Sequence, residues 1–209
     1  MLFVLFVPLV VIGVVTAVVL QRRYGRVEPH RLLRGLALGL AATFTVFAGL
    51  FLVAETVDDP GGAVALALIV AWLVPLVAMA VVAWWWPKVA APFLAVLVGA
   101  VVAAGAWYAV APDWWRAFED DRGPVRAVAV FALSLPLALL AWHRPVPGAA
   151  LLITVGVVPG LLALVAAGDR GAGAATVAVS SPTALVGLLY LAAEWSRPHA
   201  GPEAAAASG

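Results

Sequence analysis

Acidic side chains gather in two short stretches of the chain, and carboxylates are well suited to bind a cation or to move a proton. Four of them fall within nine residues, and three more lie in an earlier stretch. The seven residues are Glu55, Asp58, Asp59, Asp113, Glu119, Asp120 and Asp121. Their oxygens suit Ca²⁺ or Mg²⁺, but the later stretch lacks the alternate-residue spacing and central glycine of an EF-hand. The pattern therefore favours a solvated acidic patch, and we expect no metal site.

Hydroxyl side chains form a second group of residues that could have a chemical role. Ser180, Ser181 and Thr183 surround Pro182, and Ser134 lies in an earlier apolar segment. Because proline leaves a backbone carbonyl without its helical donor, neighbouring hydroxyls can satisfy that carbonyl. The same hydroxyls could instead line a polar cavity for a solute. The sequence favours the first interpretation and leaves the second open.

Catalytic constellations are missing from the sequence. There is no cysteine, and His30, His143 and His199 lack the spacing of H-E-x-x-H or a serine-hydrolase motif. The one lysine, Lys88, lies at an expected helix end, so a retinal-type Schiff base is excluded. A lipid-modifying enzyme would need the two acidic stretches to converge in a cleft. We therefore expect no catalytic residue, no cofactor and no enzymatic activity.

The composition indicates the environment, water or lipid, in which the chain folds. Hydrophobic residues make up 65% of the 209 residues and charged residues only 11%, against about 45–50% and about 25% in soluble domains. A soluble surface cannot hide that excess, whereas a bilayer can accommodate it. The net charge of +1 comes without a basic, aromatic-interleaved run, which gives no indication of nucleic-acid binding.

Apolar runs of the length needed to cross a bilayer, about 17–25 residues, recur along the chain. We expect an all-α bundle of seven transmembrane helices in one domain over residues 1–197, and a disordered cytoplasmic tail over 198–209. The expected spans are approximately residues 2–20, 32–54, 63–85, 89–111, 125–142, 149–167 and 174–193.

Basic residues predict the orientation of these spans. With seven spans, eight basic residues lie on one side of the membrane and four on the other. The first set is Arg22, Arg23, Arg26, Arg31, Arg34, Lys88, Arg144 and Arg197, and the second is Arg116, Arg122, Arg126 and Arg170. Positive residues favour the cytoplasmic face, so we expect the N-terminus outside and the C-terminus inside.

A Trp-x-x-Pro pattern recurs at the expected inner ends of three helices. It begins at Trp84, Trp142 and Trp195, and the first copy lies in the run Ala83-Trp84-Trp85-Trp86-Pro87. Indole rings favour the membrane interface and proline ends a helix. The expected interfacial anchors are Trp84, Trp142, Trp195, Lys88, Arg144 and Arg197. The repeat is explained either by duplication of a helical hairpin or by convergence on the same interface chemistry.

Charged residues avoid the middle of every expected span. Arg34, Glu55, Arg126 and Glu194 come nearest to an exception, and each is close enough to a span end to extend separately to the interface. Proton- or sodium-coupled carriers need buried carboxylates, so this distribution argues against them.

Two functions remain compatible with the sequence. The favoured one is a non-catalytic accessory or scaffold component of the cell membrane. The alternative is a transporter for a small neutral solute. We expect the lipid bilayer as partner, together with other membrane proteins or a second copy, through small-residue faces such as Gly35-x-x-x-Gly39 and Gly156-x-x-x-Gly160. Arginine outnumbers lysine by eleven to one, which is typical of GC-rich bacterial genomes.

Overall fold

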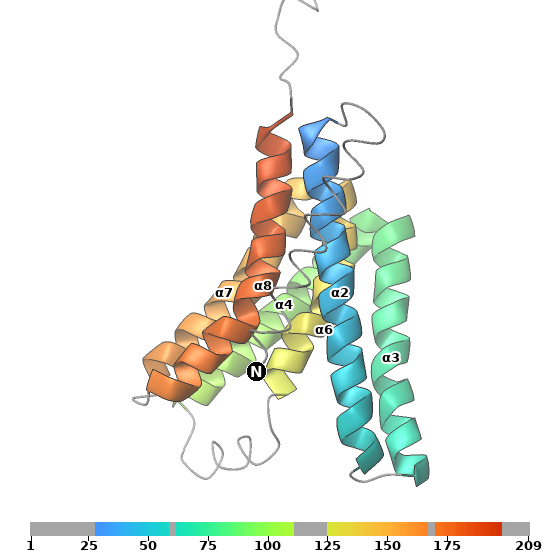
Figure 1. The fold of residues 1–209 in the computed structure, drawn as a ribbon, viewed down its shortest axis with the longest axis vertical. Helices are drawn as coiled ribbons and strands as arrows, with labels where there is room; N and C mark the ends of the chain where they lie inside the picture. Colours follow the sequence, from blue (N-terminus) through green and yellow to red (C-terminus); the bar gives the residue numbers. More distant parts are fainter. Residues whose placement is uncertain (1–27, 59–61, 111–124, 167–169, 198–209) are drawn as a thin grey trace, which may run out of the picture.

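Helices account for nearly all of the residues that the computed structural model describes, namely 28–58, 62–110, 125–166 and 170–197 (Figure 1). The helices are α2 (Pro29–Asp58), α3 (Gly62–Trp85), α4 (Pro87–Val110), α6 (Val125–His143), α7 (Pro145–Ala166) and α8 (Arg170–Trp195). No strand occurs in these ranges, which confirms the expected all-helical class. The expected first span, residues 2–20, and the tail, 198–209, lie outside the described residues.

Proline begins three of these helices. Pro29, Pro87 and Pro145 are the first residues of α2, α4 and α7. Proline suits this position because its φ is already helical and its missing N–H would have had no partner there. A single non-helical residue, Trp86 or Arg144, separates α3 from α4 and α6 from α7. Two helical hairpins with the same short turn result.

Most helices extend beyond the apolar segments expected from the sequence. The α2 helix covers residues 29–58, where the apolar run covers 32–54. The hydrocarbon core requires apolar residues only along its own thickness, and a helix can continue into polar surroundings at both ends. Likewise α7 begins at Pro145 and not at residue 149, because proline in the first turn starts a helix without breaking it.

The α6 helix lies at the centre of the bundle and contacts each of α2, α3, α4, α7 and α8. The α3 helix lies at one edge, and α7 and α8 pack together on the opposite side (Figure 1). Many of the buried core residues are alanines, which allow helix backbones to approach closely. The core includes Ala37, Ala41, Phe44, Ala83, Ala90, Leu94, Val98, Leu137, Leu140, Ala141, Leu152, Val155, Val186 and Tyr190.

Glycines of α7 and α8 allow these two helices to approach each other closely. A Cβ added at Gly156 would lie 2.5 Å from the backbone nitrogen of Ala184, and one at Gly187 would lie 2.8 Å from Cγ1 of Ile153. Nothing lies within 4 Å of the corresponding position at Gly39. The second Gly-x-x-x-Gly motif thus contributes Gly156 to packing inside the bundle, whereas the first faces outward.

Among the described residues, two helices are long and apolar enough to span a membrane. They are α3, with a mean hydropathy of 2.7, and residues Pro87–Trp107 of α4, with a mean hydropathy of 2.3. In the apolar stretch that qualifies each helix, none of the α3 residues and only 22% of the α4 residues are buried inside the molecule. The core helix of a soluble protein would be mostly buried, whereas these two helices are largely exposed within the described structure.

Candidate functional site

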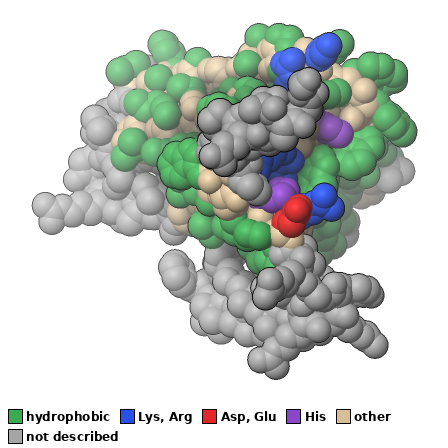
Figure 2. Space-filling model, turned by 90° about the horizontal axis from the view of Figure 1, so that it is seen from above, with side chains coloured by type: hydrophobic (Ala, Val, Ile, Leu, Met, Phe, Trp, Pro, Cys, Tyr) green, Lys and Arg blue, Asp and Glu red, His purple; other side chains and the backbone are tan. Residues whose placement is uncertain are grey.

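The charged side chains that the structure describes gather at one end of the bundle. We call it the Trp end, after Trp84, Trp142 and Trp195 at the C-terminal ends of α3, α6 and α8. The N-terminal ends of α2, α4 and α7 lie at the same end (Figure 1). Figure 2 looks down on it and shows Lys, Arg and His side chains among hydrophobic ones that extend to the rim.

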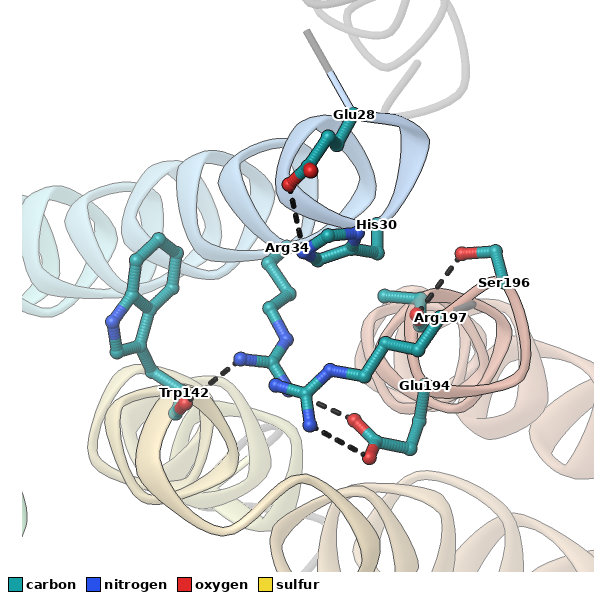
Figure 3. Close-up of polar contacts among 8 residues, drawn as sticks. Glu28, His30, Arg34, Trp142, Glu194, Ser196 and Arg197 are labelled. Carbon is teal, nitrogen blue, oxygen red and sulfur yellow. Dashed lines mark hydrogen bonds and ion pairs between the residues drawn. The ribbon is translucent and has the colours of Figure 1, made fainter. Parts of the chain in front are cut away.

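A salt bridge between Arg34 and Glu194 joins α2 to α8 at the Trp end. Nη2 of Arg34 donates to Oε2 of Glu194 at 2.9 Å, and Nη1 of Arg197 donates to Oε1 of the same carboxylate at 3.0 Å (Figure 3). The Arg34 side chain is only 12% exposed and that of Glu194 is 27% exposed. One carboxylate therefore compensates two guanidinium groups, of which Arg34 is the more buried.

Arg34 also connects the salt bridge to α6. Its Nη1 donates a 3.5 Å hydrogen bond to the backbone carbonyl of Trp142. Trp142 lies in the last turn of α6, where backbone carbonyls lack helical donors. A single buried cation thus links the ends of three helices, α2, α6 and α8.

Three buried polar atoms at this end have no hydrogen-bond partner within the described part of the chain. They are Nδ1 of His30, Nε of Arg34 and the hydroxyl of Tyr190. Tyr190 is fully buried, lies one turn before Glu194 on α8, and is within electrostatic range of Arg34. The unpartnered hydroxyl of Tyr190 therefore belongs to a buried side chain one turn inward of the salt bridge on α8.

Glu28 organises the start of α2. Its carboxylate lies 3.0 Å from Nε of Arg31 and 3.4 Å from Nε2 of His30. It directly precedes the helix, where a negative charge interacts favourably with the helix dipole. Its backbone carbonyl accepts the N–H of Arg31 at 2.9 Å. The contacts of Glu28 thus stabilise the end of the helix that carries Arg34.

The expected anchor Trp84 does more than mark an interface. Its ring packs edge-on against His143 at the end of α6, with ring centroids 5.1 Å apart. Trp85 and Trp86 meet in a similar edge-on contact at 6.4 Å. The run of three tryptophans therefore joins the two hairpins through its first ring and exposes its other two.

The remaining expected anchors lie at the Trp end with differing exposure. Trp195 is 79% exposed. Lys88, Arg144 and Arg197 are exposed as well, whereas Trp142 is partly buried. Exposed indoles beside basic residues are the pattern of a membrane interface.

The structure brings two of the four expected hydroxyls together. The hydroxyls of Ser134 on α6 and Thr183 on α8 are 3.0 Å apart in a hydrogen bond, and both side chains are fully buried. Ser181 faces outward, and the side chain of Ser180 lies outside the described part. The buried pair acts as a polar link between two core helices.

An open apolar groove runs between α2, α3 and α6, which we call the lateral groove. Its volume is about 620 Å³. Its lining residues are Thr45, Val46, Gly49, Leu50, Leu73, Leu76, Val77, Ala80, Val81, Trp84, Trp85, Ala132, Leu135, Pro136 and Leu139. Trp84 and Trp85 line the end of the groove that lies at the Trp end.

The expected acidic patch falls mostly outside the described residues. Glu55 and Asp58 belong to the last turn of α2, but their side chains are not described, and the other five members lie in segments without described structure. Within the described ranges, no group of three or more His, Cys, Asp or Glu side chains is placed to hold a metal ion.

The Arg34–Glu194 pair is the main feature that the sequence did not predict. The two residues are 160 positions apart, and the sequence predicts that each extends separately to the interface. They pair with each other instead, because α2 and α8 are neighbours in the bundle. Their opposite charges on the same expected side were a usable signal, but the adjacency of α2 and α8 was not visible in the sequence.

The arrangement can stabilise helix ends and present an apolar surface, and basic side chains outnumber acidic ones among the described residues of the Trp end. A scan against protein-family models and searches of curated proteins and of solved structures found no match for this chain.

Proposed function

We propose that this chain is an integral membrane protein with seven spans in a bacterial cell membrane. In this proposal the N-terminus is outside and the Trp end is cytoplasmic. The length, hydropathy and exposure of α3 and α4 support it. So does the charge of the Trp end, where the described residues include five basic and two acidic ones. A basic face of this kind favours the cytoplasmic side.

We further propose that the protein acts without catalysis, as an accessory or scaffold component that works through its lateral surface. One observation carries this proposal. Few polar groups are fully buried in the described core: the hydroxyls of Ser134 and Thr183 bond to each other, and the third is the hydroxyl of Tyr190. The described exterior, by contrast, exposes many large apolar side chains, among them Val46, Leu50 and Val77. Within the described residues, the surface offered to a partner along the sides of the bundle is therefore mainly apolar.

Native extraction tests this function. Membranes are solubilised with a styrene–maleic acid copolymer, the tagged protein is purified, and its partners are quantified by mass spectrometry. The accessory role predicts a membrane partner at constant stoichiometry that survives a second purification step. Liposomes that contain the protein alone should swell in neutral solutes at the same rate as empty liposomes. Isolation without a partner, together with solute flux, would contradict the proposal.

A small-solute transporter is the second candidate, and the matching hairpins favour it. The α3–α4 and α6–α7 pairs share Trp-x-x-Pro, a one-residue turn and a proline at the start of the second helix. Parallel internal repeats of this kind occur in transporter folds. Prolines also occur in the interiors of α3, α4, α6, α7 and α8, and proline-containing helices can bend around a substrate path.

A further inference from the structure

The lateral groove is chemically uniform and opens to the side of the molecule. Its lining is almost wholly apolar, and several lining side chains are well exposed, including Val46, Leu50, Leu73 and Val77. A surface of this kind in water would cost free energy in proportion to its apolar area. The groove therefore needs an apolar occupant, and its dimensions identify which kind.

The length of the groove matches one leaflet of a bilayer. Along α3 it extends from Leu73 to Trp85, which is about 18 Å at a helical rise of about 1.5 Å per residue. Half of a hydrocarbon core that is about 30 Å thick is about 15 Å. Trp84 and Trp85 lie at one end, where indoles mark headgroup depth. The groove thus runs from headgroup depth to about the middle of the membrane, as an acyl chain does.

The charge near the mouth of the groove favours an anionic headgroup. Lys88 follows Trp84 by four residues at the start of α4 and is exposed. Arg144 directly follows His143, whose ring packs against Trp84. Both cations therefore lie close in the chain to the residues that form the mouth. A surface basic residue attracts anionic lipid with a free energy that corresponds to roughly fivefold in affinity.

We propose that the lateral groove binds one acyl chain of an anionic phospholipid, whose phosphate lies beside Lys88 and Arg144. This site rests on the membrane placement proposed above. It adds a specific lipid ligand to a protein that otherwise only requires a bilayer.

Native mass spectrometry tests the site with two probes, palmitoyl-oleoyl phosphatidylglycerol and palmitoyl-oleoyl phosphatidylcholine. The wild-type protein in detergent should retain one phosphatidylglycerol molecule in preference to phosphatidylcholine. Ala80→Phe fills the groove and should weaken the retention of both lipids roughly tenfold. Its matched control is Ala78→Phe, at an exposed position two residues away on α3 that does not line the groove, and it should behave as wild type.

Headgroup variants separate charge from chain binding. Lys88→Gln and Arg144→Gln should each lower phosphatidylglycerol retention roughly fivefold and leave phosphatidylcholine unchanged. Arg31→Gln removes a basic residue from the Trp end on α2, away from the groove mouth in the chain, and should leave both unchanged. Equal retention of the two lipids by the wild type would overturn the proposal, and so would wild-type retention by Ala80→Phe.

A second measurement does not depend on the folding of Ala80→Phe. Val77→Cys introduces the only cysteine in the chain and can carry a bimane fluorophore inside the groove. Phosphatidylglycerol spin-labelled on its acyl chain should quench this bimane more strongly than the equivalent phosphatidylcholine. Two other occupants are detected with the same variant. A disulfide from the introduced cysteine to one placed within residues 2–20, or between the introduced cysteines of two copies, would show that protein covers the groove and would overturn the lipid site.

Failure of the site is distinguishable from failure of the membrane proposal. Release of the protein from membranes by alkaline carbonate would overturn the membrane placement and the lipid site together. Retention in the membrane without selective binding of phosphatidylglycerol would overturn the lipid site alone.

Discussion

Arg34 is the residue on which the Trp end depends most. It is nearly buried, it bonds to Glu194 and to the carbonyl of Trp142, and its Nε has no partner in the described part of the chain. Removing the Glu194 carboxylate should lower the stability more than removing the Arg34 cation. Without Glu194, Arg34 loses its compensating charge, whereas without Arg34 the carboxylate keeps a second partner. Glu194 has that second partner in Arg197.

This asymmetry gives the first prediction. Glu194→Gln leaves Arg34 uncompensated and should destabilise the protein by about 2–3 kcal/mol, less than for a fully buried pair. Arg34→Gln should cost about 1 kcal/mol, and the double variant should be more stable than Glu194→Gln. The measurement is the apparent Tm from tryptophan fluorescence in detergent, with Glu194→Gln lower by roughly 5–10 °C. Equal shifts for the two single variants would show that the pair is solvated.

The Ser134–Thr183 hydrogen bond gives the second prediction at this scale. Thr183→Val keeps the side-chain shape and removes the hydroxyl, so it should cost about 0.6 kcal/mol, the average for such bonds in membranes. The accessory role predicts no change in partner stoichiometry. In a transporter whose path included this hydroxyl, Thr183→Val would instead alter the solute flux of reconstituted liposomes, with a similar Tm.

The sequence predicted the composition of the site better than its pairings. The tryptophans and basic residues of the Trp end follow from interface chemistry, which acts on each residue separately. Contacts such as Arg34–Glu194, Ser134–Thr183 and Trp84–His143 depend on which helices are neighbours, and a single sequence carries little information about that. The sequence predicts that the hydroxyls serve the proline kink or a cavity; the bond between Ser134 and Thr183 across α6 and α8 is a contact that it did not specify.

The α7 and α8 helices pack closely against each other, and glycine makes this contact possible. Gly156 faces the backbone of Ala184, where an added methyl group would overlap main-chain atoms that cannot move independently. On α2, Gly35 and Gly39 have the same Gly-x-x-x-Gly spacing but face open space. The motif alone therefore did not predict which copy packs against another helix.

A third prediction follows for the two copies of the motif. Gly156→Ala should destabilise the protein by at least about 1–3 kcal/mol, because overpacking forces α7 and α8 apart. Its matched control is Gly39→Ala, which should leave the stability unchanged or raise it by up to about 1 kcal/mol through helix propensity. Apparent Tm values of the two variants in the same detergent make the comparison. A loss of stability in Gly39→Ala that matches Gly156→Ala would contradict the assigned helix faces.

Helix positions were largely visible in the sequence because hydropathy and proline placement are local properties. The expected segments from residue 32 onward each coincide with a helix, and the differences at the ends reflect helical turns that continue into polar residues. The central place of α6 and the open groove beside α3 are properties of packing. They depend on side-chain volumes at contacts between distant segments, which the hydropathy pattern does not specify.

The whole molecule combines a basic, tryptophan-rich end with long apolar helices, and we propose that a membrane orients it by that asymmetry. The central claim is that the Trp end is cytoplasmic and the acidic segments are external. The natural chain has no cysteine, so single cysteines report their own positions without background. Suitable positions are Lys88→Cys and Arg144→Cys at the Trp end, and Asp59→Cys and Asp121→Cys in the acidic segments.

The most direct test is labelling of these four variants in intact cells with a membrane-impermeant maleimide. The proposed topology predicts labelling at positions 59 and 121 in intact cells, and at 88 and 144 only after permeabilisation. Labelling of position 88 from outside the cell would contradict the orientation, and labelling of all four positions in intact cells would contradict the membrane-spanning arrangement itself.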